Sequence, residues 1–67
     1  MMYYEHYLYF DEEKGNVDDC VTWESISEWR ESTENEDNLI LVWSHLFNAA
    51  GDFVASYKDG EFKEYDR

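Results

Sequence analysis

Three glutamates with helical spacing are the residues of this chain whose arrangement could do chemistry. Glu24, Glu28 and Glu31 are four and three residues apart, so a helix would place them on one face, about 5–6 Å from one another. No Lys or Arg falls on that face, and like charges at these spacings destabilise a helix by about 0.2–0.5 kcal/mol per pair. Such a row of carboxylates can bind cationic side chains, and arginine pairs with a carboxylate in bidentate geometry.

Further acidic residues lie close to this row in the sequence. They extend the candidate partner-binding set with Asp18, Asp19, Glu34, Glu36 and Asp37. Lys and Arg arrays that bind DNA phosphates could bind spaced carboxylates in the same way. The pattern is also typical of a solvated helix face in an acidic protein. The sequence leaves both interpretations open.

The helix that would position the row is predicted for residues 22–35. At helical spacing, the side opposite the glutamates carries Trp23, Ile26, Trp29 and Thr33. Thr22 fits an N-cap, which would make Val21 and Ile26 a hydrophobic staple. One face of this helix could therefore anchor a core while the other presents charge.

The remaining segments are typical of strands. Strands are predicted for residues 2–10, 39–47, 53–57 and 61–65, whereas 17–21 is either a loop or a short strand that pairs back on the first. The apolar run 39–47 indicates a central strand covered on both faces, at least at its start. Residues 53–57 alternate, with Phe53, Ala55 and Tyr57 on one face. Gly51 marks a loop and Asp59-Gly60 a tight hairpin turn.

These elements fit one small domain over residues 1–67. We expect the α+β class, with an antiparallel sheet of about four strands and one amphipathic helix packed on one face, in the order β-α-β-β-β. Thirteen aromatic residues would supply the core of so short a chain. We expect Tyr3, Tyr7, Tyr9, Trp43 and Phe53 to be mostly buried.

Charge is the strongest global feature. Seventeen acidic residues face five basic ones, for a net charge of −12, and this exceeds the magnitude of about 2–8 that keeps a small domain in solution. Direct nucleic-acid binding is excluded because phosphates require Lys and Arg. No apolar run is long enough to span a membrane. We expect a monomer in the cytoplasm of a bacterial host, where the single Cys20 would stay reduced.

Neither a metal site nor an active site is predicted. The soft metal ligands, His6, Cys20 and His45, are far apart in the sequence and lack paired spacing. The segment 11–22 fails the calcium-loop pattern because Gly15 and Thr22 occupy the wrong places. Phosphate-loop and nucleophile-elbow motifs are missing, and a chain of this size offers little volume for a pocket. We therefore expect no cofactor and no enzymatic activity.

The size, the acidity and the row Glu24, Glu28, Glu31 together resemble a class of inhibitors. The chain is similar to the small acidic DNA-mimic inhibitors of phages and mobile elements, of the anti-CRISPR type. The resemblance is at the level of the class and covers no diagnostic motif. It implies a partner with a basic DNA-binding groove, such as a host nuclease or the PAM-reading site of a CRISPR effector complex.

The alternative function is a protein–protein interaction module, such as an antitoxin, an immunity protein or an accessory subunit. It would bind through its aromatic sheet face or by adding a strand at an edge. Mimicry predicts affinity that falls steeply with salt and is lost to competing DNA. An aromatic interface predicts neither effect, so salt separates the two functions.

Overall fold

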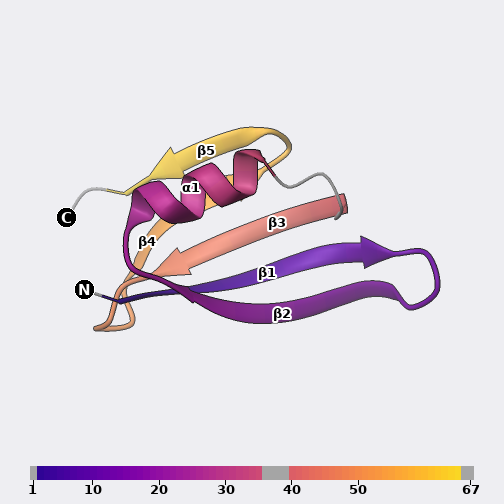
Figure 1. Cartoon of the computed structure of the whole chain (residues 1–67), viewed down its shortest axis with the longest axis horizontal. Coiled ribbons are helices and arrows are strands. Elements are labelled where there is room, and N and C mark those ends of the chain that lie inside the picture. The colour runs from indigo at the N-terminus through magenta and orange to yellow at the C-terminus, as the bar shows by residue number, and fades with distance from the viewer. Residues whose placement is uncertain (1, 36–39, 66–67) are drawn as a thin grey trace.

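The computed structural model describes residues 2–35 and 40–65 (Figure 1). Within these residues the elements are β1 (Tyr3–Asp11), β2 (Gly15–Trp23), α1 (Ile26–Glu34), β3 (Ile40–Phe47), β4 (Phe53–Lys58) and β5 (Glu61–Glu64). The strands form one antiparallel sheet in the order β2-β1-β3-β4-β5. The α+β class is confirmed in this coarse form, but the described sheet has five strands and the chain order is β-β-α-β-β-β.

The additional strand is β2, which pairs with β1 along its whole length. The register runs from Tyr3 opposite Trp23 to Asp11 opposite Gly15. Asp11 closes the turn, because its Oδ1 accepts the backbone N–H groups of Glu13 at 2.8 Å and Lys14 at 3.1 Å. The ambiguous segment 17–21 is therefore the middle of an edge strand.

Because β2 continues through Trp23, the helix begins later than the sequence indicated. Its N-cap is Ser25, whose Oγ accepts the backbone N–H of Glu28 at 3.1 Å. Glu28 Oε2 in turn accepts the backbone N–H of Glu24 at 3.1 Å, a variant of the capping box. The predicted N-cap at Thr22 and its hydrophobic staple are wrong, because Thr22 lies inside β2 opposite Tyr4 and the cap is Ser25, three residues later.

The core lies where α1 packs on the sheet. Trp29, Leu46 and Ala55 are fully buried, and the ring of Phe62 meets Trp29 edge-on at 5.5 Å. Figure 1 shows α1 beside β3, β4 and β5, while the far end of the β1–β2 hairpin extends beyond it. A nine-residue helix is only about 13 Å long. The half of the sheet formed by β1 and β2 is therefore only partly covered.

Two register shifts decide which side chains reach each face. One lies between Leu8 and Tyr9 in the β1–β3 pair, and it places Leu41 on the helix side of β3. The other lies between Leu46 and Phe47 in the β3–β4 pair. It puts Phe53 on the face opposite Ala55, so the simple alternation predicted for 53–57 is wrong at its start.

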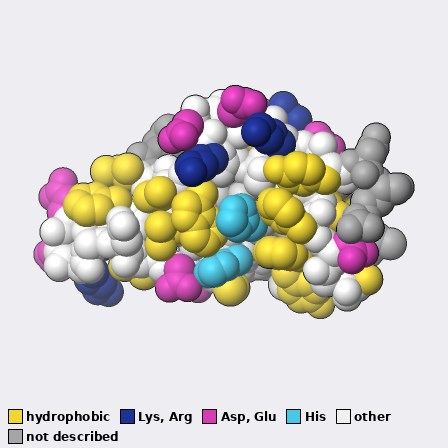
Figure 2. All heavy atoms as spheres, turned by 180° about the vertical axis from the view of Figure 1, so that it is seen from behind, with side chains coloured by type: hydrophobic (Ala, Val, Ile, Leu, Met, Phe, Trp, Pro, Cys, Tyr) yellow, Lys and Arg dark blue, Asp and Glu magenta, His cyan; other side chains and the backbone are white. Residues whose placement is uncertain are grey.

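The face of the sheet away from α1 is rich in aromatic groups. Ring contacts run across it from His6 to Trp43, His45, Phe53 and Tyr65. Figure 2 shows hydrophobic side chains gathered around the two histidines on this open face. Phe53 is 38% exposed and Ile40 is 61% exposed. β3 is central as predicted, but the expectations that its start is covered on both faces and that Phe53 is buried are wrong.

Candidate functional site

The cleft between α1 and the β1–β2 half of the sheet is the candidate functional site. Its inner part has a volume of about 160 Å³ and is lined by Glu5, Tyr7, Val21, Trp23, Ser32, Thr33 and Leu41. Its outer part is a wider hollow lined by Trp23, Glu28, Glu31, Ser32 and Asn35. Trp23 and Ser32 line both parts, so the two hollows adjoin each other. We call the whole hollow the acidic cleft.

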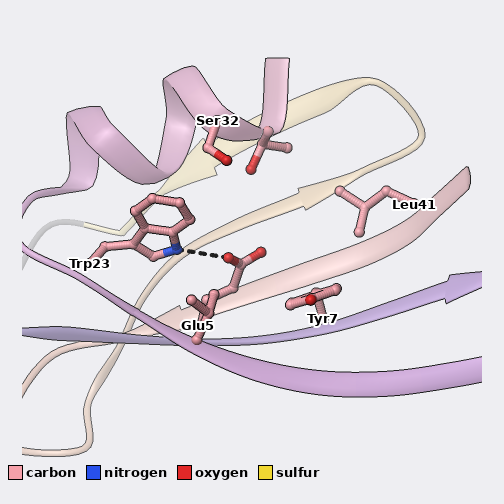
Figure 3. A pocket seen from close by; sticks show the side chains of 7 residues that line it. Glu5, Tyr7, Trp23, Ser32 and Leu41 are labelled. Carbon is pink, nitrogen blue, oxygen red and sulfur yellow. Dashed lines mark hydrogen bonds between the residues drawn. The ribbon is translucent and has the colours of Figure 1, made fainter. Parts of the chain in front are cut away.

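A carboxylate lies at the base of the acidic cleft. Glu5 is only 6% exposed, and its Oε1 accepts the indole N–H of Trp23 at 2.8 Å (Figure 3). Its Oε2 accepts the hydroxyl of Ser44 at 2.5 Å, and Ser44 Oγ accepts the indole N–H of Trp29 at 2.9 Å. This chain of bonds satisfies the buried polar groups and ties α1, β1, β2 and β3 together.

Two of the predicted glutamates lie on the rim of the acidic cleft. Glu28 and Glu31 both project from the side of α1 that lines the outer hollow, and both are exposed. Glu24 precedes the helix rather than belonging to it, but its backbone bond to the Glu28 carboxylate holds the two residues together. The structure therefore keeps Glu28 and Glu31 on one side of α1 and ties the backbone of Glu24 to Glu28, which differs from the predicted ladder of three helical glutamates.

The other predicted site residues do not form one surface with these three. Asp18 and Asp19 are neighbours in a strand, so their side chains point to opposite faces. Asp19 shares the helix side with Val21, whereas Asp18 accepts the His6 Nε2–H at 3.0 Å on the open face. Glu34 turns toward β5, where Arg30 bonds both Glu34 at 3.4 Å and Glu64 at 3.1 Å. Glu36 and Asp37 lie outside the described residues.

The described cations lie away from the acidic cleft. Lys14 is in the β1–β2 turn, and Lys58 and Lys63 belong to β4 and β5 positions that face away from α1. Arg30 is held over the Phe62 ring at 4.6 Å and is engaged by its two glutamates. Within the described part of the chain, the carboxylates of the acidic cleft therefore have no cation to neutralise them.

The surroundings shift the pKa values of Asp18, Asp11 and His45. The hydrogen bond from His6 lowers the pKa of Asp18, and the two backbone N–H bonds lower the pKa of Asp11. The pKa of His45 is lowered mainly by desolvation, and to a smaller extent by repulsion from His6 and Lys58. These three groups do not line the acidic cleft, so their shifted pKa values do not change the charge of its lining.

The predicted separation of His6, Cys20 and His45 holds only in the sequence. In the sheet, His6 on β1 lies between Cys20 on β2 and His45 on β3. Even so, among the described residues no group of three metal-ligating side chains is arranged to hold a metal ion. No helix in this part of the chain has the length and apolar character needed to cross a membrane.

Sequence reasoning missed Glu5 and the cap formed by Ser25. Glu5 stood among tyrosines in the first strand, and a lone acidic residue on an aromatic face was an available signal for a buried polar contact. Ser25 and Glu28 have the S-x-x-E spacing of a capping box. Both features depend on β2, a strand that the sequence alone does not establish.

Comparison with protein-family models, with curated proteins and with solved structures finds no match for this chain. Its function is therefore inferred from the geometry and chemistry of its surface.

Proposed function

We propose that this protein is an acidic inhibitor that mimics DNA and occupies the positively charged DNA-binding groove of another protein. The target would be a host nuclease or a CRISPR effector complex, for example at its PAM-reading site. The observation that carries the proposal is the separation of charge. Carboxylates line the acidic cleft at Glu5, Glu28 and Glu31, and the backbone of Glu24 is bonded to Glu28, whereas the described cations lie on other parts of the molecule.

The chemistry of recognition follows from this arrangement. Lys and Arg side chains that normally bind phosphate oxygens would bind the exposed carboxylates of Glu28 and Glu31. The large net negative charge would speed association with a basic groove and make binding sensitive to salt. Trp23, at the junction of the two hollows, offers a flat surface on which an arginine can stack.

The test combines capture with competition. The tagged protein is incubated with bacterial lysate, and the captured complex is washed in steps of increasing salt or challenged with duplex DNA. The recovered partner is then purified and assayed for DNA cleavage with and without the protein. Mimicry predicts a DNA-binding partner that is released by salt and by duplex DNA and whose cleavage activity is inhibited.

A charge-matched pair of variants makes the test specific. The triple variant E24Q/E28Q/E31Q should weaken binding by about a hundredfold or more, because each lost charge-assisted bond costs about 1.5–3 kcal/mol. Gln at position 28 can still accept the Glu24 N–H, so the helix start is preserved. The control E12Q/E13Q/E61Q removes the same charge elsewhere and should bind nearly as well. Equal binding by the two variants would exclude the acidic cleft as the mimic.

A second candidate function is favoured by the open aromatic face. Its large apolar groups include Tyr4 at 49% exposure and Phe10 at 43%, and exposed apolar patches mark interaction sites. An interaction module would bind a partner here through contacts that survive high salt. Phe10→Ser should then release that partner, whereas Val21→Ser, on the other face, should not. Salt-resistant capture that is insensitive to Phe10→Ser would exclude this function.

A further inference from the structure

The inner part of the acidic cleft combines a buried carboxylate with space beside it. Figure 3 shows the Glu5 carboxylate pointing into the gap between α1 and the sheet, toward Ser32. No described Lys, Arg or His side chain forms an ion pair with Glu5. Burying a charge without a counter-charge is costly. A carboxylate in this position is therefore matched to a cation that arrives from outside the described chain.

Glu5 keeps the capacity to bind such a cation. An ionised carboxylate has about four acceptor positions on its two oxygens. The bonds from Trp23 and Ser44 use one position on each oxygen. One position on each oxygen remains for a donor that enters the cavity.

The rest of the lining is suited to a planar donor. Thr33 donates its hydroxyl proton to the Trp29 carbonyl at 2.8 Å, so its Oγ1 presents only lone pairs to other groups. Trp23 and Tyr7 supply aromatic walls, and Val21 and Leu41 supply apolar ones. A guanidinium group carries only donors, is weakly hydrated and stacks on aromatic faces, whereas an ammonium group is strongly hydrated and compact.

The volume sets the size of the group. About 160 Å³ is well above the roughly 10–15 Å³ that a cavity needs to hold one water molecule. The cavity therefore has room for a group of several heavy atoms, such as a guanidinium with its adjoining methylene. We infer that the Glu5 cavity binds an alkylguanidinium group, and that in the complex it receives the side chain of an arginine from the basic partner. This inference rests on the proposed function and deepens it.

The experiment uses a small probe in place of the partner. Ethylguanidinium chloride is titrated into the full-length protein while the indole N–H signal of Trp23 is followed by NMR. Saturable movement of that signal is expected, with weaker binding of ethylammonium and none of ethylurea, which is similar in shape but neutral. Movement that is not saturable, or that is equal for ethylurea, would overturn the inference.

Variants separate the cavity from general electrostatics. Glu5→Gln should weaken ethylguanidinium binding by about tenfold or more, as expected for the loss of a charge-assisted bond. Val21→Phe should abolish binding by filling the cavity. This variant keeps Glu5 and its hydrogen bonds, so it tests the cavity even if Glu5→Gln does not fold. Glu12→Gln, in the β1–β2 turn away from the cleft, also removes one negative charge and should bind the probe nearly as the parent does. Undiminished binding by Val21→Phe would overturn the inference.

The NMR titration with ethylguanidinium and the capture of a partner from lysate test the two proposals separately. A protein that captures a salt-sensitive, DNA-competed partner but does not bind ethylguanidinium keeps the proposed function and loses the cavity as an arginine site. A protein that binds ethylguanidinium but captures no DNA-binding partner retains a guanidinium site, and its role as a DNA mimic is excluded.

Discussion

The hydroxyl of Ser44 on β3 donates to the carboxylate of Glu5 on β1 at 2.5 Å, inside the protein. The two residues are 39 positions apart in the chain, and the same serine oxygen accepts the indole N–H of Trp29 from α1. One small side chain thus satisfies a buried acceptor and a buried donor at once. The base of the acidic cleft and the anchor of the helix are therefore one hydrogen-bonded unit.

Ser44→Ala should destabilise the fold strongly. It leaves the Trp29 indole N–H and one Glu5 oxygen without a partner, at a cost of about 1–3 kcal/mol for each buried group. Urea denaturation followed by tryptophan fluorescence would measure the loss. Ser27→Ala, an exposed change within α1, is the control and should shift the unfolding free energy by less than about 0.5 kcal/mol. Equal stabilities of the two variants would contradict the role given to Ser44.

The start of α1 can be tested with two single changes. Ser25→Ala removes the N-cap and should cost about 0.5–2 kcal/mol. Thr22→Ala, at the position the sequence indicated as the cap, should have a smaller effect because Thr22 is an exposed residue of an edge strand. Both values come from urea denaturation monitored by circular dichroism. A larger effect at Thr22 than at Ser25 would contradict this helix boundary.

The β4–β5 turn gives a test of backbone conformation. Asp59 and Gly60 have φ angles of 53° and 80°, both in the left-handed region that a tight hairpin of this kind requires. Gly60→Ala should therefore cost about 1–2 kcal/mol, because a Cβ disfavours that conformation. Asp59→Asn is the control and should be nearly neutral, since Asn tolerates the left-handed region. Thermal unfolding would separate the two variants.

The stability of the fold should depend on the protonation of His45. Its pKa is lowered in the folded protein, so below about pH 6.5 the unfolded chain binds more protons there than the folded protein does. The free energy of unfolding should then decrease as the pH falls from about 6.5 through the lowered pKa. In His45→Phe this contribution disappears, and urea denaturation across a pH series should show a flatter dependence.

Other charged groups on the open face also affect how stability depends on pH. They must be the same in the parent protein and in His45→Phe. Besides His6 and Lys58, the open face carries Asp18, Glu61 and Lys63. The pKa of Asp18 is also lowered, so its contribution to stability is present above about pH 3.8 and is lost as the pH falls through its own lower pKa. The two effects therefore occupy separate pH ranges. An unchanged slope between about pH 7 and 5 in His45→Phe would contradict the assignment to His45.

The sequence by itself determined the features that depend on local chemistry. Alternating and continuous apolar runs located β1, β3, β4 and β5 to within one residue at each end, because side-chain period and β-propensity are properties of short segments. Gly51 and Asp59-Gly60 marked turns because few residues accept a positive φ angle. The excess of acidic residues also follows directly from composition.

Only the tertiary structure decided the features that depend on pairing between distant segments. β2 is a polar, exposed strand that is held in place by β1. Because β2 extends through Trp23, the helix N-cap is Ser25 rather than Thr22, the residue that the sequence indicated. Once β2 existed, Asp18 and Asp19 had to point to opposite faces, which divided the predicted acidic surface. Glu5 became the buried base of a cleft because Trp23 and Ser44 reached it from other strands, and no short segment specifies such a meeting.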